Sequence, residues 1–271
     1  MGVTLTLLNQ KGGVGKTSLT HHLAGALSAR GRRVLLVDND PQASLTQGFI
    51  GPAACRSLDR DTTVAGLYRG QSYAESVRFP VGIPGVDLIA GSRWATPFNL
   101  PEPETLDWSL QRTLADGLDS IRGEYDLVLI DCPPNLHLCS WAALAASDAL
   151  IVPLKPEDYG AQGIIEVNDS YQSVRARINP GLALLGYLLT LLAPRKTVHK
   201  MYEQTLRESY GPLVFDARMP DLTEFVEALN GRQAAEQYKP KGAAAKAMRA
   251  IADEIESRLA AVSLGQERGA A

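Results

Sequence analysis

The chain is expected to adopt an α/β fold with three layers, in which helices cover both faces of a mostly parallel, twisted sheet. Apolar runs of strand length alternate with segments of helical periodicity along the 271 residues, a pattern typical of parallel strands joined by crossover helices. The first apolar run leads through a glycine-rich turn into a helical segment. Two later runs end in aspartates, which parallel strands would bring to one edge of the sheet.

The apolar and amphipathic segments give the expected elements in chain order. Strands are expected near residues 3–9, 33–38, 86–90, 126–131, 149–153 and 183–190. Helices are expected near residues 16–30, 105–122, 138–146, 160–178, 197–210 and 243–262. Residues 51–100 contain several prolines and glycines and are interpreted as an elaborated connection rather than a separate domain. We therefore predict a single domain over residues 1–262 and a small, polar, disordered tail at 263–271.

The segment between the first strand and the first helix has the composition of a phosphate-binding loop. It reads NQKGGVGKTS, from Asn9 to Ser18. Its glycines allow a tight turn that points successive backbone N–H groups at an anion, and the next helix adds the partial positive charge of its N-terminus. Lys16 is placed to reach the β- and γ-phosphates of a nucleotide, and the Thr17 hydroxyl is placed to ligate Mg²⁺.

Aspartates follow two further predicted strands. Asp38 and Asp40 end the run RRVLLVDND, and Asp131 ends YDLVLID. Because ligands bind at the carboxyl ends of parallel strands, these carboxylates are expected beside the glycine-rich loop. Asp131 is interpreted as a Walker B aspartate that holds Mg²⁺ through a water molecule.

The loop departs from the usual G-x-x-x-x-G-K-[ST] pattern, because Gln10 replaces the first glycine and Lys11 follows it. With this second lysine, NQKGGVGKT resembles the deviant Walker A loop of the ParA/MinD ATPases, most closely their ParA, Soj-like branch. The resemblance covers about residues 1–260 and implies a fold of the P-loop NTPase type. It implies that Lys11 crosses an ATP-sandwich dimer to the partner's nucleotide. DNDPQ resembles the family's D-x-D-P-Q switch, in which the second aspartate, here Asp40, orients the attacking water.

The motifs and the resemblance together give the expected site of a weak, Mg²⁺-dependent ATPase with ATP and ADP as its nucleotides. Lys11, Lys16 and Asp40 are expected to be catalytic. The nucleotide is expected to contact Lys11, Gly12, Gly13, Val14, Gly15, Lys16, Thr17, Ser18 and Pro220, the last as a proline near the adenine. Thr17, Asp40 and Asp131 are expected at the metal.

DNA contacts are expected in the second half of the chain. Arg195 matches an arginine that the family uses for sequence-independent DNA binding, and a basic patch supplies the phosphate contacts that such binding needs. The expected DNA-binding residues are Arg195, Lys196, Lys200 and Lys246. Asp221 and Glu224 stand where the family pattern has basic residues. An ordinary solvated face therefore stays open as the alternative.

Composition limits the classes of protein and the compartment. The formal net charge is −3 and the sequence pI is about 5.9, which exclude a strongly basic nucleic-acid binder. The three cysteines, Cys55, Cys132 and Cys139, form no C-x-x-C pair, and their odd number favours a reducing cytoplasm. No apolar run reaches the roughly 18 residues of a membrane span. The C-terminal helix is expected to pack on the core through Met248, Ile251, Ile255, Leu259 and Val262 rather than bind a membrane.

The resemblance implies a homodimer that forms on ATP binding, associates with the nucleoid and is stimulated by a ParB-like protein, so that chromosome or plasmid DNA is segregated. An alternative is the same ATPase positioning a protein cargo, such as a chemosensory cluster or a microcompartment. A remote alternative is a metal-cluster carrier or reductase, for which Cys132 and Cys139 would have to be ligands rather than core residues. No N-terminal helix-turn-helix domain is expected, because the lysine motif begins at residue 11.

Overall fold

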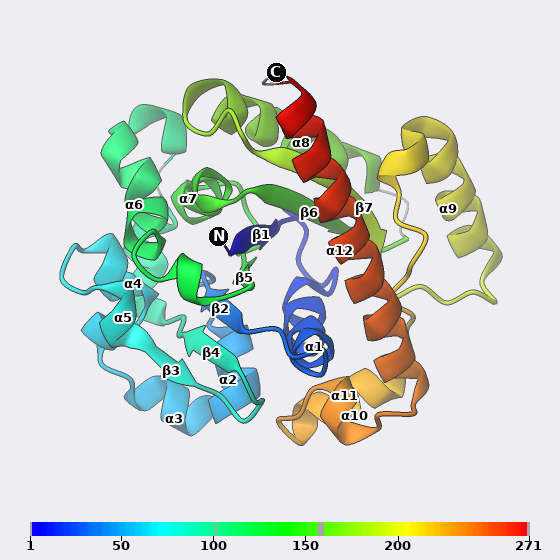
Figure 1. Ribbon diagram of the computed structural model, residues 1–271, viewed down its shortest axis with the longest axis horizontal. Coiled ribbons are helices and arrows are strands. Elements are labelled where there is room, and N and C mark those ends of the chain that lie inside the picture. Colours follow the sequence, from blue (N-terminus) through cyan, green and yellow to red (C-terminus); the bar gives the residue numbers. More distant parts are fainter. Residues whose placement is uncertain (1, 101, 157–159, 270–271) are drawn as a thin grey trace.

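Seven strands form one twisted sheet in the computed structural model, which describes residues 2–100, 102–156 and 160–269, without the side chains of 160–162 and 263–269 (Figure 1). The strand order is β3-β4-β2-β5-β1-β6-β7. All neighbouring pairs are parallel except β3 with β4, which is antiparallel. The predicted mostly parallel α/β fold is confirmed.

The strands lie close to their expected positions, with one addition. They are β1 (Val3–Leu7), β2 (Val34–Asp38), β3 (Arg78–Pro80), β4 (Val86–Ile89), β5 (Leu127–Asp131), β6 (Ala149–Leu154) and β7 (Ala183–Leu189). The addition is β3, a short edge strand that the sequence analysis placed in an irregular connection. Its three residues end in Pro80. A proline has no N–H to donate, and an edge strand tolerates this because its open side needs no donor.

Helices occupy both faces and the carboxyl edge of the sheet. They are α1 (Lys16–Ser28), α2 (Ser44–Ile50), α3 (Pro52–Ser57), α4 (Val64–Tyr68), α5 (Ala74–Val77), α6 (Trp108–Leu118), α7 (Leu138–Ala146), α8 (Gly160–Arg177), α9 (Thr197–Tyr210), α10 (Thr223–Asn230), α11 (Ala235–Tyr238) and α12 (Ala243–Gly269). Short 3-10 turns are η1 (Arg60–Thr62), η2 (Arg93–Phe98), η3 (Pro103–Thr105), η4 (Arg122–Glu124) and η5 (Gly211–Leu213).

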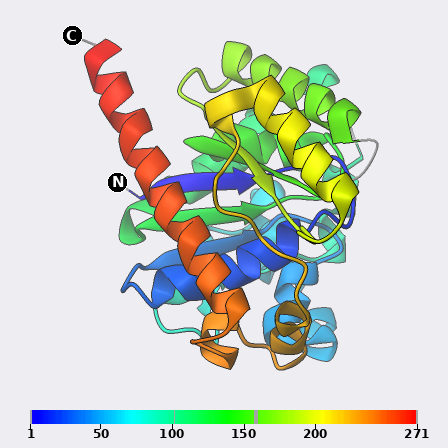
Figure 2. The same ribbon diagram turned by 90° about the vertical axis from the view of Figure 1, so that its right-hand side faces the viewer.

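The two faces of the sheet carry separate hydrophobic cores. In β5, Val128 and Ile130 point to the core that α4, α6, α7 and α8 cover. Leu127 and Leu129 alternate with them and point to the core under α1, α2, α10, α11 and α12. Figures 1 and 2 show α12 packed against α1 and crossing it on this second face. The three-layer arrangement thus follows from near-continuous apolar strands that are buried on both sides.

The C-terminal helix packs as the sequence predicts. Met248, Ile251 and Ile255 are fully buried, and Leu259 and Val262 pack against the same core. The backbone of α12 continues to Gly269, into the segment 263–271 expected to be disordered. Residues 270–271 lie outside the described residues, and the domain boundary and the tail stay predictions. In the described part of the chain, no helix combines the length and apolar character needed to cross a membrane.

Two expectations about local structure need correction. Residues 51–100 are not simply irregular, because short helices α3, α4 and α5 fold there, the first with Pro52 in its first turn. The helix expected over 105–122 is shorter and begins at Trp108, where the Asp107 carboxylate accepts a hydrogen bond from Ser109 N–H at 2.9 Å. This side chain caps the helix and fixes its start.

Register brings the ends of three strands together. β5 lies between β1 and β2, with Asp131 opposite Leu7 on one side and opposite Asp38 on the other. The glycine-rich loop leaves the carboxyl end of β1, and Asp38 and Asp131 end β2 and β5 at the same edge. Residues far apart in the sequence therefore meet where the strand order reverses direction, the position at which open α/β sheets bind ligands.

Candidate nucleotide-binding site

The glycine-rich loop has the backbone conformation that its glycines make possible. Gly13 and Gly15 have φ values of 71° and 85°, in the left-handed region that strains other residues. A Cβ built on Gly13 would meet nothing within 4 Å, so conformation rather than space requires this glycine. Helix α1 begins at Lys16 and has no side-chain cap. Its first N–H groups are therefore available to an anion.

Residues from neighbouring strands hold this loop. Asn9 Nδ2 donates to the Pro153 carbonyl at 2.7 Å, and Asn9 Oδ1 accepts from Lys11 N–H at 2.9 Å. On the other side, the Thr190 hydroxyl donates to the Val14 carbonyl at 2.6 Å. The sequence analysis missed the anchoring roles of Asn9 and Thr190. A polar residue directly after each apolar strand was the available signal.

Lys16 lies inside the loop. Its Nζ donates to the carbonyl oxygens of Asn9 and Lys11 at 2.9 and 3.0 Å, and the residue is 6% exposed. Burial lowers the pKa of Lys16, while nearby Asp131 opposes this shift. Only carbonyl oxygens accept from this ammonium in the hydrogen bonds described, so an anion in the loop would supply the missing counter-charge.

Asp131 and Thr17 meet at the base of the loop. The Thr17 hydroxyl donates to Asp131 Oδ2 at 2.7 Å, whereas the buried Asp131 Oδ1 has no hydrogen-bond partner. Burial first, and then the charge of Asp38, raise the pKa of Asp131. Burial also raises the pKa of Asp38, to about 7. It raises the pKa of Asp40 as well. Crowded, desolvated carboxylates with one open oxygen fit a divalent cation.

The protein side chains alone do not complete a metal site. Among the described residues, no group of three or more His, Cys, Asp and Glu side chains is arranged to hold a metal ion. A cation here would thus take Thr17, Asp131 and nucleotide or water oxygens, as Mg²⁺ does when it is bound with phosphates. The residues present fit that arrangement.

A cavity of about 570 Å³ opens beside the loop. Asp40 and Ser44 are among its polar lining residues, and an apolar wall comes from Leu191 after β7 and from residues in and just before α10. The lining residues are Gly12, Gly13, Val14, Gly15, Lys16, Thr17, Ser18, Asp40, Ser44, Gly48, Pro134, Leu191, Met219, Asp221, Leu222, Phe225, Val226 and Leu229. Of the residues expected to contact nucleotide, Lys11 and Pro220 are not in this lining, although Met219 and Asp221 on either side of the proline are.

The apolar wall was not identified from the sequence. It comes from α10, whose Phe225 is buried while Val226 is 58% exposed. The available signal was the pair of adjacent apolar residues in TEFVEALN, since one helix face cannot bury both and large exposed apolar side chains often border ligand sites. Lys11, in contrast, packs beside α8, where a Cβ built on Gly163 would lie 3.8 Å from Lys11 Cε.

The residues expected at DNA lie in two places. Arg195, Lys196 and Lys200 are exposed around the start of α9. Lys246 is exposed in the first turns of α12, which pack against α10 and α11 and lie apart from α9 in both views (Figures 1 and 2). Glu224 does not lie free on the surface, because its Oε2 accepts from Ala244 N–H at 2.9 Å and so caps α12.

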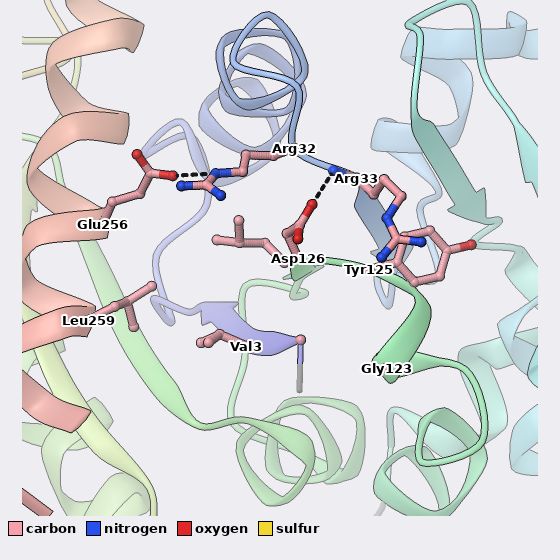
Figure 3. A pocket seen from close by; sticks show the side chains of 10 residues that line it. Val3, Arg32, Arg33, Gly123, Tyr125, Asp126, Glu256 and Leu259 are labelled. Carbon is pink, nitrogen blue, oxygen red and sulfur yellow. Dashed lines mark hydrogen bonds and ion pairs between the residues drawn. The ribbon is translucent and has the colours of Figure 1, made fainter.

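A second cavity lies at the opposite, amino edge of the sheet. It measures about 460 Å³, and Val3, Arg32, Asp126 and Glu256 are among its lining residues (Figure 3). Arg32 Nε is paired with Glu256 Oε1 at 2.8 Å, and Asp126 Oδ2 accepts from Arg33 N–H at 2.7 Å. Glu256 thus has an ionic partner and Asp126 has a backbone donor, in contrast to Asp131 Oδ1 beside the glycine-rich loop, which has no partner.

The cysteines are core residues in this structure. Cys132 and Cys139 are 1% and 0% exposed and belong to the core under α6 and α7. The Cys139 carbonyl accepts from Asn39 Nδ2 at 2.7 Å, which ties α7 to the end of β2. Their burial favours the structural interpretation over cluster ligation.

Comparisons with known proteins agree with this geometry. A family model described as AAA domain matches residues 2–184. The chromosome-partitioning ATPase Soj of Thermus thermophilus is 34% identical over 258 residues, which cover 94% of this chain and 96% of the relative. The chromosome partitioning protein ParA of Caulobacter vibrioides is 33% identical over 257 residues, 94% of each chain. Cobyrinic acid a,c-diamide synthase from Mycobacterium smegmatis, solved with bound ADP and magnesium, superposes with a TM-score of 0.79 at 27% identity over 93% of each chain.

The family match spans the glycine-rich loop, the Asp38–Asp40 turn and Asp131. The two curated relatives extend the similarity over nearly the full length. This chain therefore belongs to the ParA/MinD family of partition ATPases.

Proposed function

We propose that this chain is a Mg²⁺-dependent ATPase that hydrolyses ATP to ADP and phosphate and uses the cycle to segregate chromosome or plasmid DNA. The observation that carries the proposal is the group formed by Lys16, Thr17 and Asp131 at the carboxyl edge of β1 and β5. Family membership and the ADP and magnesium in the Mycobacterium smegmatis structure support ATP and Mg²⁺ as the cofactors.

Each residue of the site has a distinct chemical task. The loop N–H groups and Lys16 bind the phosphates and offset the charge that develops on them. Thr17 and Asp131 would hold Mg²⁺, which would supply further neutralisation of the phosphate charge. Asp40, on the cavity wall, orients the attacking water. Among the described residues that line the cavity, none is a stronger base than a carboxylate, so basal hydrolysis is weak in this proposal.

ATP drives the formation of a sandwich dimer in this proposal. Lys11 does not line the cavity of its own subunit, which is consistent with its delivery to the partner's nucleotide. A cation supplied in trans acts as an arginine finger does and contributes about 10³- to 10⁵-fold in rate. Activity then depends on dimerisation.

The dimer is proposed to bind DNA without sequence preference and to respond to a ParB-like partner. The three exposed basic residues around the start of α9 support phosphate contacts, and dimerisation doubles them. The names of the curated relatives support chromosome partition as the process. We place the protein in the cytoplasm, on the nucleoid when ATP is bound.

Two variants test the ATPase and the dimer separately. Lys16→Ala should lose nucleotide binding, because no other side chain supplies its charge to the phosphates. Asp40→Ala leaves the phosphate loop and Thr17 intact, so it should bind ATP and accumulate as a dimer that does not hydrolyse. Size-exclusion chromatography with ATP and Mg²⁺ and isothermal titration with ATP measure both effects. Full hydrolysis by Lys16→Ala would refute the ATPase assignment, and a monomeric Asp40→Ala protein would refute the role given to Asp40.

A further inference from the structure

Asp38 is buried at the edge of the site without lining the nucleotide cavity. The residue is 0% exposed, and its two carboxylate oxygens accept three hydrogen bonds. Oδ2 accepts from the N–H and the hydroxyl of Thr46 at 2.8 and 2.6 Å, and Oδ1 accepts from Asp40 N–H at 3.3 Å. A carboxylate that is fully engaged with its own chain is used for structure rather than for ligand contact.

Thr46 extends this network to a third segment. Its hydroxyl, having donated to Asp38, accepts from Gly91 N–H at 2.8 Å. A Cβ built on Gly91 would lie 2.6 Å from Asp38 Cγ, so only glycine allows this close approach. We call Asp38, Thr46 and Gly91 the clasp. It joins the end of β2, the first turns of α2 and the segment after β4.

The clasp closes a short loop that contains Asp40. Residues 38 and 46 are its two ends, and between them Asp40 Oδ1 accepts from Gln42 N–H at 2.9 Å while the Asp40 carbonyl accepts from Ala43 N–H at 2.8 Å. Ala43 has a φ of 54°, in the left-handed region, which a non-glycine residue keeps only when its surroundings impose it. The ends of the loop must be fixed for this turn to persist.

We propose that Asp38 and Thr46 are positioning residues, which hold the loop of residues 39–45 so that Asp40 faces the nucleotide cavity. This inference rests on the proposed ATPase function and assigns to the first aspartate of the D-x-D pair a role different from that of the second. Asp38 fixes the position of Asp40, and Asp40 orients the attacking water. A misplacement of about 1 Å at such a group costs on the order of 100-fold in rate.

Thr46→Val tests the clasp because it removes the hydroxyl and preserves the shape of the side chain. Thr46→Ser restores the hydroxyl. The matched control is Thr6→Val in β1, where an equally buried threonine hydroxyl donates to the Ala143 carbonyl at 3.1 Å, on the face of the sheet that packs against α7. Asp38→Asn is a second variant in case Thr46→Val does not fold. The asparagine side chain has one acceptor oxygen in place of two, so it cannot accept from Thr46 on one side and from Asp40 N–H on the other.

Two measurements are made on each protein. Hydrogen exchange without nucleotide reports the loop directly: amides of residues 39–47 should exchange about tenfold faster or more in Thr46→Val and at the wild-type rate in Thr46→Ser and Thr6→Val. Turnover at saturating ATP should fall about 10- to 100-fold in Thr46→Val, with ATP affinity changed by less than about threefold, and should recover in Thr46→Ser.

The outcomes separate the clasp from the proposed function. Unchanged exchange in both Thr46→Val and Asp38→Asn would overturn the clasp. Faster exchange with wild-type turnover would overturn the positioning role. An equal loss of turnover in Thr6→Val would assign the effect to lost stability. A wild-type protein without ATPase activity would refute the proposed function, and with it the positioning role, while the exchange data would still decide whether the clasp holds the loop.

Discussion

The hydroxyl of Thr17 and the carboxylate of Asp131 are joined by a hydrogen bond of 2.7 Å, although 114 residues separate them in the chain. The bond uses Asp131 Oδ2 and leaves Oδ1 buried without a partner. The two residues of the proposed metal site are thus linked directly to each other. Their effect on Mg²⁺ can be measured through nucleotide binding, apart from turnover.

Asp131→Asn should weaken the contribution of Mg²⁺ to nucleotide binding. An amide keeps the size of the side chain but removes the negative charge, so we expect about a tenfold smaller gain in ADP affinity when Mg²⁺ is added. Titration calorimetry with ADP, in Mg²⁺ and in EDTA, measures this gain. Asp126→Asn, just before the start of β5, is the matched control. An unchanged gain in Asp131→Asn would show that this carboxylate does not serve the metal.

Mixed dimers should reveal whether Lys11 acts in trans. Lys11→Ala and Lys16→Ala should each be inactive alone. In a mixed dimer held by the one ATP on the Lys11→Ala subunit, the site that keeps Lys16 receives Lys11 from the other subunit. We expect partial recovery of ATP hydrolysis in the mixture, measured as phosphate release. The control replaces Lys16→Ala by the Lys11→Ala, Lys16→Ala double variant, which supplies neither lysine and should give no recovery. Undiminished hydrolysis by Lys11→Ala alone would contradict the arrangement.

DNA binding should depend on ATP and strongly on salt. If Arg195, Lys196 and Lys200 each neutralise one phosphate, two subunits offer about six contacts and log K should fall with log salt at a slope of about −5. Arg195→Glu should lower affinity for duplex DNA by about tenfold or more at low salt. Fluorescence anisotropy with unrelated duplex sequences measures both. Lys246→Glu, on α12 and apart from α9, tests whether that residue belongs to the same surface.

A dimer that forms on ATP but does not bind DNA at low salt would reject the nucleoid as its surface. Positioning of a protein cargo would then be the better description of the same ATPase. The DNA experiment therefore decides between the two classes of function that the sequence alone left open.

Glu224 should matter for stability because it caps α12. Glu224→Ala removes the acceptor of the Ala244 N–H at the first turn of this helix. We expect the free energy of unfolding to fall by about 1 kcal/mol, as for the loss of other helix caps. Urea denaturation without nucleotide measures the change, with Asp221→Ala as the exposed control. Equal stabilities would show that the cap contributes nothing measurable.

Acid should destabilise the fold through two histidines of α1. Burial lowers the pKa of His21 to about 4 and that of His22 to about 3, the latter also through the charge of His21. The unfolded chain binds these protons near pH 6.5, whereas the folded chain binds them only near pH 4 and below. The contribution of the two neutral histidines to the free energy of unfolding is therefore fully present above pH 6.5 and falls as the pH drops toward 4. The loss should be about 2 kcal/mol per histidine between pH 7.5 and 5.

His21→Phe keeps the ring that stacks on Phe49 at a centroid distance of 4.0 Å and removes the titratable group. The free energy of unfolding, measured by urea at several pH values, should then depend less steeply on pH. His137→Phe, beside Glu102 on the surface, is the control substitution. An unchanged pH dependence in His21→Phe would contradict the assignment.

The sequence predicted the strands and the phosphate loop because both depend on local patterns. Buried parallel strands such as VLLVD are near-continuous apolar runs, and the loop needs glycines at fixed spacing. Residues whose roles depend on distant partners were missed. Asn9 and Thr190 anchor the loop through Pro153 and Val14. The polar residue after each apolar run is visible in the sequence, but its partner is not.

The second half of the chain was predicted less completely for the same reason. Glu224 looked like a lost basic contact, because its sequence position was compared with a family pattern. Its partner, Ala244 N–H, lies 20 residues further along, and only the packing of α10 against α12 shows the cap. The apolar cavity wall of α10 likewise depends on how that helix faces the loop.

The position of β5 has a consequence for when the newly made chain can bind a nucleotide. β1 and β2 do not touch each other in the sheet, since β5 separates them and β1 pairs only with β5 and β6. A ribosome-bound chain that ends before residue 127 thus contains the phosphate loop but no strand to support its β1. We therefore expect the chain to hold a nucleotide only after β5 has been added to the sheet, long after the lysines of the loop have been synthesised. Nucleotide binding would then be a late event in biosynthesis and would report that the centre of the sheet is complete.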